Sequence, residues 1–138
     1  MLSWLKRLFE KKPPFRIEHP KFGVLTYDSG LWSGRLRSEE GEFSFTVAGT
    51  TSAPDASLLE KLERALARFA ELKSRALDFL ASLDPHIKAS EFRLDSLDLL
   101  WPHQPERFFI NFSLQWDRWA IWRVEFLADK PNCLSRDG

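Results

Sequence analysis

The chain has 138 residues, and its twenty basic side chains balance twenty acidic ones. This length fits one domain, and a neutral chain lacks the electropositive surface that nucleic-acid binding normally requires. The single cysteine cannot form an intramolecular disulfide and gives no sign of an oxidising compartment. No apolar run approaches the roughly 20 residues that span a bilayer, and residues 1–10 lack the pattern of a signal peptide. We therefore expect a cytoplasmic protein.

Residues 2–12 predict a short amphipathic helix that Pro13 and Pro14 terminate. So short a helix is marginal in isolation, so its apolar side must pack against something. The alternatives are its own domain, a second copy in a homodimer, or a membrane surface, since basic residues flank the apolar side. The membrane or oligomer contacts would be Trp4, Leu5, Leu8 and Phe9. Residues 1–14 are thus set apart from a single domain over residues 15–130.

Residues 21–49 predict three antiparallel strands. A three-residue loop, Asp28-Ser29-Gly30, joins the first two, because Gly30 can adopt the left-handed conformation that such a loop needs. This register pairs Thr26 with Trp32, Val24 with Gly34 and Phe22 with Leu36. The next turn places Arg37 opposite Glu42, a favourable cross-strand pair. It also puts Phe43, Phe45 and Val47 on the face of Trp32 and Leu36.

A long amphipathic helix is predicted over residues 57–83. Ser57 and Glu60 have the spacing of a capping box, and Asp84-Pro85 ends the helix. Apolar residues recur every three or four positions along one side, and charged residues cover the other. The apolar stripe consists of Leu62, Ala65, Leu66, Phe69, Leu72, Ala76, Leu80 and Leu83.

Residues 91–129 predict three more strands. The apolar alternation changes phase near Asp95 and Ser96, which indicates a β-bulge. Apolar residues then alternate over 108–116 and again over 122–126. A three-residue loop over 117–119 keeps both apolar sets on one face, whereas a two-residue turn would separate them. The loop pairs Leu114 with Trp122, Phe112 with Val124 and Ile110 with Phe126.

These elements predict an α+β domain. Its single antiparallel sheet has about six strands, arranged as three strands, one long helix and three strands, with the helix packed on the apolar face. Residues 131–138 are expected to form a loosely ordered tail.

No cluster of reactive side chains stands out. The three histidines, His19, His86 and His103, are far apart in the sequence and fit no zinc pattern. Cys133 has no identifiable catalytic partners. Asp95 and Asp98 flank the expected bulge, where side chains are often re-aimed, and are the best acid–base candidates. We expect no metal, no cofactor and no enzymatic activity.

Several large side chains are left over once the core is assigned. Exposed aromatic and arginine residues at a sheet end are typical anchors for a protein partner. Coverage by the N-terminal helix is the alternative, and the two are equally supported. Leu31 is also left off the core face, and the candidate partner contacts are Phe109, Arg118, Trp119 and Ile121.

Two segments resemble a known pattern. Residues 22–28, FGVLTYD, followed by Trp32-Ser33-Gly34, match the opening "F-G-x-L-x-x-D … W-x-G", and residues 91–97, EFRLDSL, match a later "E-F-x-L-x-S-L". This arrangement resembles a family of small uncharacterised bacterial domains, and some such proteins are treated as toxin immunity proteins. The resemblance spans residues 20–127 in outline and implies no catalytic residue.

The leading expectation is a non-enzymatic protein-binding domain, an immunity or accessory protein in a bacterium. One alternative is peripheral membrane association through residues 2–12. Another is a small-molecule site or enzyme with a pocket between helix and sheet, involving Asp95 or Asp98.

Overall fold

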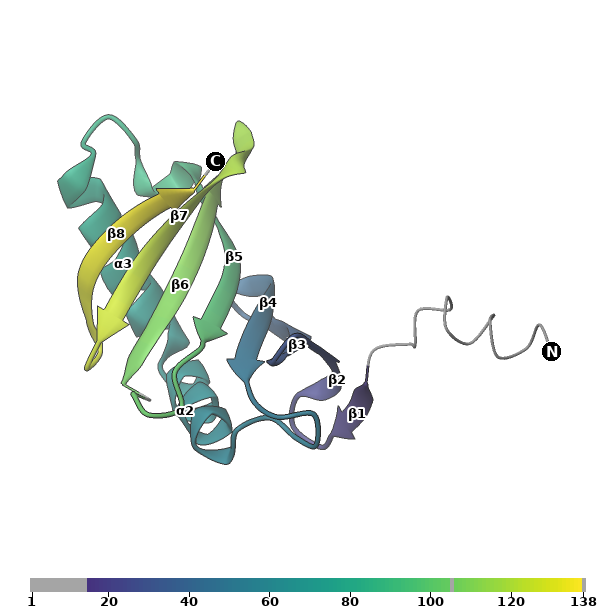
Figure 1. Ribbon diagram of the computed structural model, residues 1–138. Coiled ribbons are helices and arrows are strands. Elements are labelled where there is room, and N and C mark those ends of the chain that lie inside the picture. Colours follow the sequence, from purple (N-terminus) through teal and green to yellow (C-terminus); the bar gives the residue numbers. More distant parts are fainter. Residues whose placement is uncertain (1–14, 105, 138) are drawn as a thin grey trace.

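The computed structural model describes residues 15–104 and 106–137. The helix expected over residues 2–12, with Trp4, Leu5, Leu8 and Phe9, lies outside this part of the chain. In the described residues, one sheet of eight strands in the order β1 to β8 carries two α-helices on one face (Figure 1).

Two antiparallel halves make up the sheet. The first half contains β1 (Arg16–His19), β2 (Gly23–Asp28), β3 (Leu31–Ser38) and β4 (Gly41–Ala48). The connection contains α2 (Ala56–Ala67), α3 (Phe69–Leu83) and a short 3-10 helix, η1 (Ala89–Glu91). The second half contains β5 (Phe92–Leu99), β6 (Arg107–Leu114), β7 (Asp117–Leu127) and β8 (Lys130–Asp137).

The sheet is mixed, because β4 and β5 pair in parallel while all other neighbours are antiparallel. The helical crossover carries the chain from the C-terminal end of β4 to the opposite end of the sheet, where β5 begins, and this makes the two strands parallel neighbours. The α+β class with a mainly antiparallel sheet is therefore confirmed. The expectation of six antiparallel strands and one long helix is wrong.

The two extra strands lie at the edges of the sheet. β1 is a four-residue strand, and β8 occupies the segment expected to be a loose tail. Neither segment has a regular apolar alternation, since an edge strand is held largely by backbone pairing with one neighbour. Pro131 and a register shift in the β7–β8 ladder interrupt the β8 edge, features that discourage pairing with further strands.

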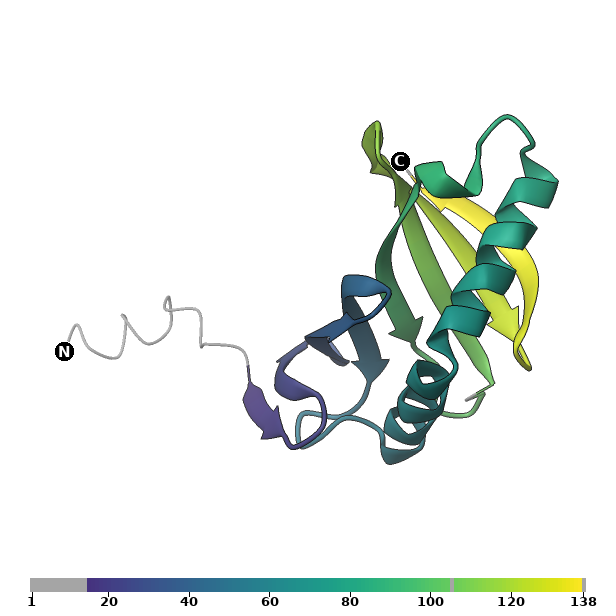
Figure 2. The same cartoon turned by 180° about the vertical axis from the view of Figure 1, so that it is seen from behind.

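The helical segment breaks at Arg68, whose backbone (φ −119°, ψ 22°) is not helical. Neither proline nor glycine marks this point, and the apolar stripe continues across it. Figure 2 shows that α2 and α3 run in different directions over the same face of a twisted sheet. The capping box is also wrong: Asp55 is the N-cap and accepts a hydrogen bond from Leu58 N at 3.1 Å, while Ser57 lies inside the helix.

The β2–β3 turn is shorter than expected. Asp28 faces Leu31 directly, so the turn contains only Ser29 and Gly30. Both residues adopt left-handed backbone conformations, with φ of 52° and 88°. Two-residue turns of this kind match the twist of the flanking strands, and here the serine accepts a positive φ.

This shorter turn shifts the register by one residue. Tyr27, not Thr26, faces Trp32, and the expected pairings of Val24 with Gly34 and Phe22 with Leu36 are wrong as well. Leu25 is fully buried whereas Val24 is 43% exposed. The next hairpin is as expected, since Arg37 faces Glu42 and the Phe43, Phe45 and Val47 set shares the core face with Trp32.

In the second half, the faces are as expected and one register is not. The bulge near Asp95 is confirmed by a register shift between Leu94 and Ser96. Phe112, however, faces Trp122 rather than Val124. A two-residue turn at 115–116 and a bulge over 118–120 replace the expected three-residue loop. Together they shift the β6–β7 pairing by two residues, so the same side chains still face the core.

The core lies between the helices and one face of the sheet. Phe43 of β4 stacks on Phe69 of α3 with ring centroids 4.8 Å apart, and Phe108 stacks on Phe126 at 4.9 Å. The helical side of the core consists of Leu58, Leu62, Ala65, Phe69, Leu72, Ala76 and Leu80. This face of the sheet is therefore filled by the side chains of the core.

Candidate functional site: the outer face of the sheet and the tip of the β6–β7 hairpin

The face of the sheet opposite the helices, here called the outer face, carries mostly polar residues in rows across the strands. Strand registers align Ser33, Thr46, Asp98, Phe109 and Glu125 in one row. They align Arg35, Ser44, Ser96, Asn111 and Arg123 in the next. Neither of the two described α-helices covers this face (Figures 1 and 2).

A pocket of about 260 Å³ opens on this face where β4 and β5 separate. The two strands pair only from Ser44 and Ser96 onward, so their N-terminal ends diverge. Bulges at Asp95 in β5 and over 118–120 in β7 lie on either side of β6. Because bulges re-aim side chains and occur frequently beside functional sites, we call this hollow the seam pocket and treat it as a candidate site.

Charged and hydroxyl side chains line the seam pocket. Arg35 and Glu42 form an ion pair of 3.3 Å, whereas Arg93, Arg118 and Asp95 form no ion pair with any described residue. The pocket is further lined by Ser44 and Ser113, with Phe43 and Leu94. Three guanidinium groups and two carboxylates leave the pocket with a net positive charge.

A buried polar cluster lies next to the seam pocket on the outer face. Asn111, 2% exposed, donates from Nδ2 to Ser96 Oγ (2.9 Å) and to Asp98 Oδ2 (2.8 Å). Burial raises the pKa of the Asp98 carboxyl, and the hydrogen bond from Asn111 and the charge of Arg123 offset this only in part. Asn111 Oδ1 has no hydrogen-bond partner in the described part of the chain.

The two acid–base candidates thus lie on the outer face and not between helix and sheet. Asp95 lines the seam pocket, and Asp98 lies in the buried cluster. A small-molecule pocket between helix and sheet, the alternative considered from the sequence, would therefore contain neither Asp95 nor Asp98.

Among the described residues, the β6–β7 hairpin presents the most exposed aromatic side chains. Trp119 is 87% exposed and Trp116 is 66% exposed, although the alternation over 108–116 predicted a core position for Trp116. Figure 1 shows this tip standing beyond the end of the sheet. Arg118 is exposed beside them, and Ile121 faces Ser113 on the outer face. Three of the four candidate contacts therefore lie together at the hairpin tip.

Phe109 lies apart from that tip. It pairs with Glu125 towards the opposite end of β6, about 13 Å from Ser113 at 3.3 Å per residue. Trp101 packs edge-on against it with centroids 5.2 Å apart, and the Arg107 guanidinium lies 3.7 Å from the Trp101 ring centroid. Phe109 thus belongs to a half-buried cluster of aromatic and arginine side chains.

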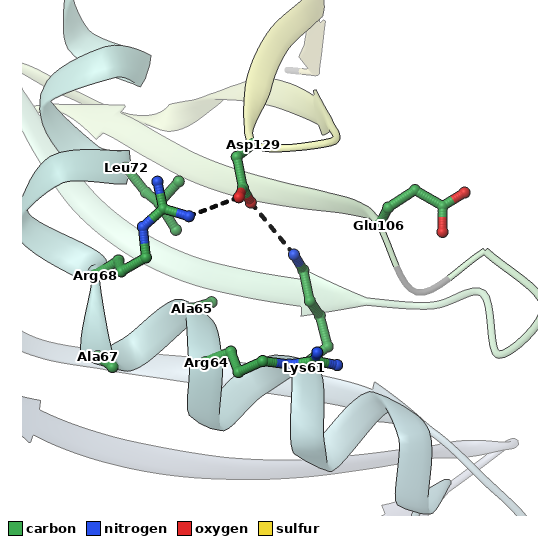
Figure 3. A pocket seen from close by; sticks show the side chains of 8 residues that line it. All are labelled: Lys61, Arg64, Ala65, Ala67, Arg68, Leu72, Glu106 and Asp129. Atoms are coloured by element: carbon green, nitrogen blue, oxygen red, sulfur yellow. Dashed lines mark hydrogen bonds and ion pairs between the residues drawn. The ribbon is translucent and has the colours of Figure 1, made fainter.

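A second pocket, of about 470 Å³, lies at the break between α2 and α3 (Figure 3). Asp129, in the β7–β8 turn, accepts hydrogen bonds from Lys61 Nζ at 3.2 Å and Arg68 Nη1 at 2.7 Å. Burial opposes ionisation of Asp129, but these partners outweigh it and hold its pKa below the ordinary value. The cluster already contains its own anion, so its evident role is to fasten the turn to the helices.

Within residues 15–104 and 106–137, no three His, Cys, Asp or Glu side chains converge as a metal site would require. His19 accepts hydrogen bonds from the backbone of Lys21 and Phe22, and Cys133 is exposed on β8. No helix in the same residues has the length and apolar character needed to cross a bilayer.

Comparison of the chain with protein-family models, with curated proteins and with solved structures finds no match in any of the three.

Sequence reasoning missed most of the seam pocket. Arg35, Arg93 and Ser113 come from three strands, and only the strand order and the two bulges bring them together. The one available signal was the phase change at Asp95, which located one of the bulges.

Proposed function

We propose that this chain is a protein-binding module whose contact surface is the β6–β7 tip together with the adjoining seam pocket. The observation that carries the proposal is the exposure of Trp119, 87%, beside the exposed Arg118. Tryptophan and arginine dominate binding energy at protein interfaces, and a bare indole at a hairpin tip contributes little to its own fold.

The partner should present an acidic surface with an apolar notch. Arg118 and Arg93 have no acidic partner among the described residues, and charge complementarity favours carboxylates opposite them. Trp119 and Trp116 would fill the notch.

The resemblance to small bacterial domains narrows the proposal to an immunity or accessory protein. A bacterial toxin is then the partner to test first. Co-expression should restore growth of cells that produce the toxin, and Trp119→Ala should abolish that protection.

Site-specific photocrosslinking in the native host tests the proposal. A photoreactive phenylalanine analogue at position 116 reports on the tip, and the same analogue at Phe15, which directly precedes β1 and is 58% exposed, is the matched control. We expect one protein to be crosslinked from position 116 and not from position 15. This crosslink should be lost in Trp119→Ala, and the captured protein, once purified, should bind the wild-type chain. Crosslinks that are absent, or equal from both positions, would refute it.

A further inference from the structure

We infer that the seam pocket is a receptor for a carboxylate group, and that in the complex it takes an Asp or Glu side chain of the partner protein. This inference rests on the proposed function, and it adds the chemistry by which the partner is recognised.

The pocket contains polar groups that the fold itself leaves unused. Ser113 is only 4% exposed, and its hydroxyl makes no hydrogen bond to a described residue. The Oγ atom itself still reaches solvent, so it can donate a hydrogen bond to a ligand atom in the pocket. Arg93 faces Ser113 across the β5–β6 ladder, and both residues line the pocket.

The charges favour a singly charged anion. Glu42 forms an ion pair with Arg35 at 3.3 Å. Of the remaining charged residues, Arg93 and Arg118 are positive and Asp95 is negative, so one positive charge is unbalanced. A carboxylate balances this charge, whereas a doubly charged phosphate exceeds it. Guanidinium groups bind carboxylates through paired, charge-assisted hydrogen bonds, and a volume of about 260 Å³ suits one side-chain head.

The position of the pocket identifies the source of the carboxylate. Arg118 belongs both to the pocket lining and to the hairpin tip that carries Trp119. A partner that covers Trp119 therefore lies over the mouth of the pocket, and its acidic side chains are the nearest carboxylates.

Two measurements test the inference on the full chain. In the first, sodium acetate is titrated while the Nε–H resonances of arginine are followed by NMR, with acetamide as the neutral control and sodium chloride as the ionic-strength control. We expect saturable shifts for Arg93 and Arg118, and none for Arg16 on β1, which is exposed. Shifts should weaken in Ser113→Ala. Uniform shifts in all arginines, or none, would overturn the inference.

In the second, the crosslinking yield from position 116 is compared among three variants. Arg93→Gln and Arg118→Gln should each lower affinity for the captured partner by about tenfold, which is the scale of one charge-assisted hydrogen bond, and Arg16→Gln should leave it unchanged. Thermal melts establish that all three fold.

The outcomes separate the two proposals. Crosslinking that persists unchanged in both pocket variants overturns the carboxylate receptor and leaves the protein-binding function standing. Saturable acetate binding without any crosslinked partner overturns both the protein-binding function and the partner side chain as the source, and assigns the pocket to a free carboxylic acid.

Discussion

Gly34 in β3 occupies a position where any side chain would be crowded. A Cβ atom built there lies 2.7 Å from Phe45 Cζ and 2.9 Å from Leu25 Cδ2. Both neighbours are fully buried in the core, so neither can move aside into solvent. This crowding gives the glycine of the Trp32-Ser33-Gly34 segment a packing role.

The substitution Gly34→Ala therefore measures the tightness of this contact. Overpacking costs about 1–3 kcal/mol, and the reduced freedom of the unfolded chain offsets about 0.4–1 kcal/mol of that. We expect a net loss of unfolding free energy of about 1–2 kcal/mol, read by urea unfolding. The melting temperature should fall by roughly 4 °C per kcal/mol.

A double-mutant cycle supplies the control. Phe45→Leu removes the ring atoms nearest to the added methyl group, so Gly34→Ala should cost less in that background, with a coupling energy of about 0.5–2 kcal/mol. A Gly34→Ala variant as stable as the wild type, or a cycle without coupling, would refute the reasoning.

Further predictions concern the two perturbed carboxylates and the tryptophans. Asp98→Asn should raise the unfolding free energy at neutral pH, because burial favours a neutral group there. This gain should shrink on acidification, since a raised pKa makes the native state hold its proton more tightly. Asp129→Asn should cost about 1–3 kcal/mol, because Lys61, with only 15% of its side chain exposed, loses its ionised partner. That loss should be present above about pH 4 and vanish as the pH falls through the lowered pKa of Asp129. Trp119→Ala should change stability by less than about 0.5 kcal/mol, whereas Trp32→Ala, at a fully buried position, should cost about 3–5 kcal/mol.

Urea unfolding from pH 3 to pH 8 checks both carboxylates together. Their variants should diverge from the wild type in opposite directions at neutral pH and approach it in acid. Equal pH profiles for the two variants would contradict the assigned environments. For the tryptophans, a large loss of stability in Trp119→Ala would show that the indole packs on the fold.

Sequence alternation predicts which face of each central strand is buried, because side chains on a strand repeat every two residues. It does not predict register. The turn at Ser29-Gly30 is one residue shorter than expected since a serine adopts a positive φ, and a bulge over 118–120 moves the β6–β7 pairing by two residues without disturbing the alternation.

Edge strands and the helix break carry no local signal. β8 pairs through its backbone along a polar segment, and Arg68 interrupts a stripe that fits an unbroken helix. For the candidate site, the sequence singles out Trp119 and Arg118, and the structure places both at the exposed hairpin tip. The seam pocket was not predictable, because its residues meet only through the β4–β5 junction.

The parallel β4–β5 junction also bears on the order of folding. Within each half, every strand pairs with its immediate neighbour in the sequence, so these hairpins close short loops. The junction must instead close a loop that contains both helices, and it pairs along only four residues, Ser44 to Val47 with Ser96 to Leu99. We expect the two halves of the sheet to form first and the β4–β5 pairing to form last. In native-state hydrogen exchange, amides shared by β4 and β5 should lose protection before those shared by β6 and β7.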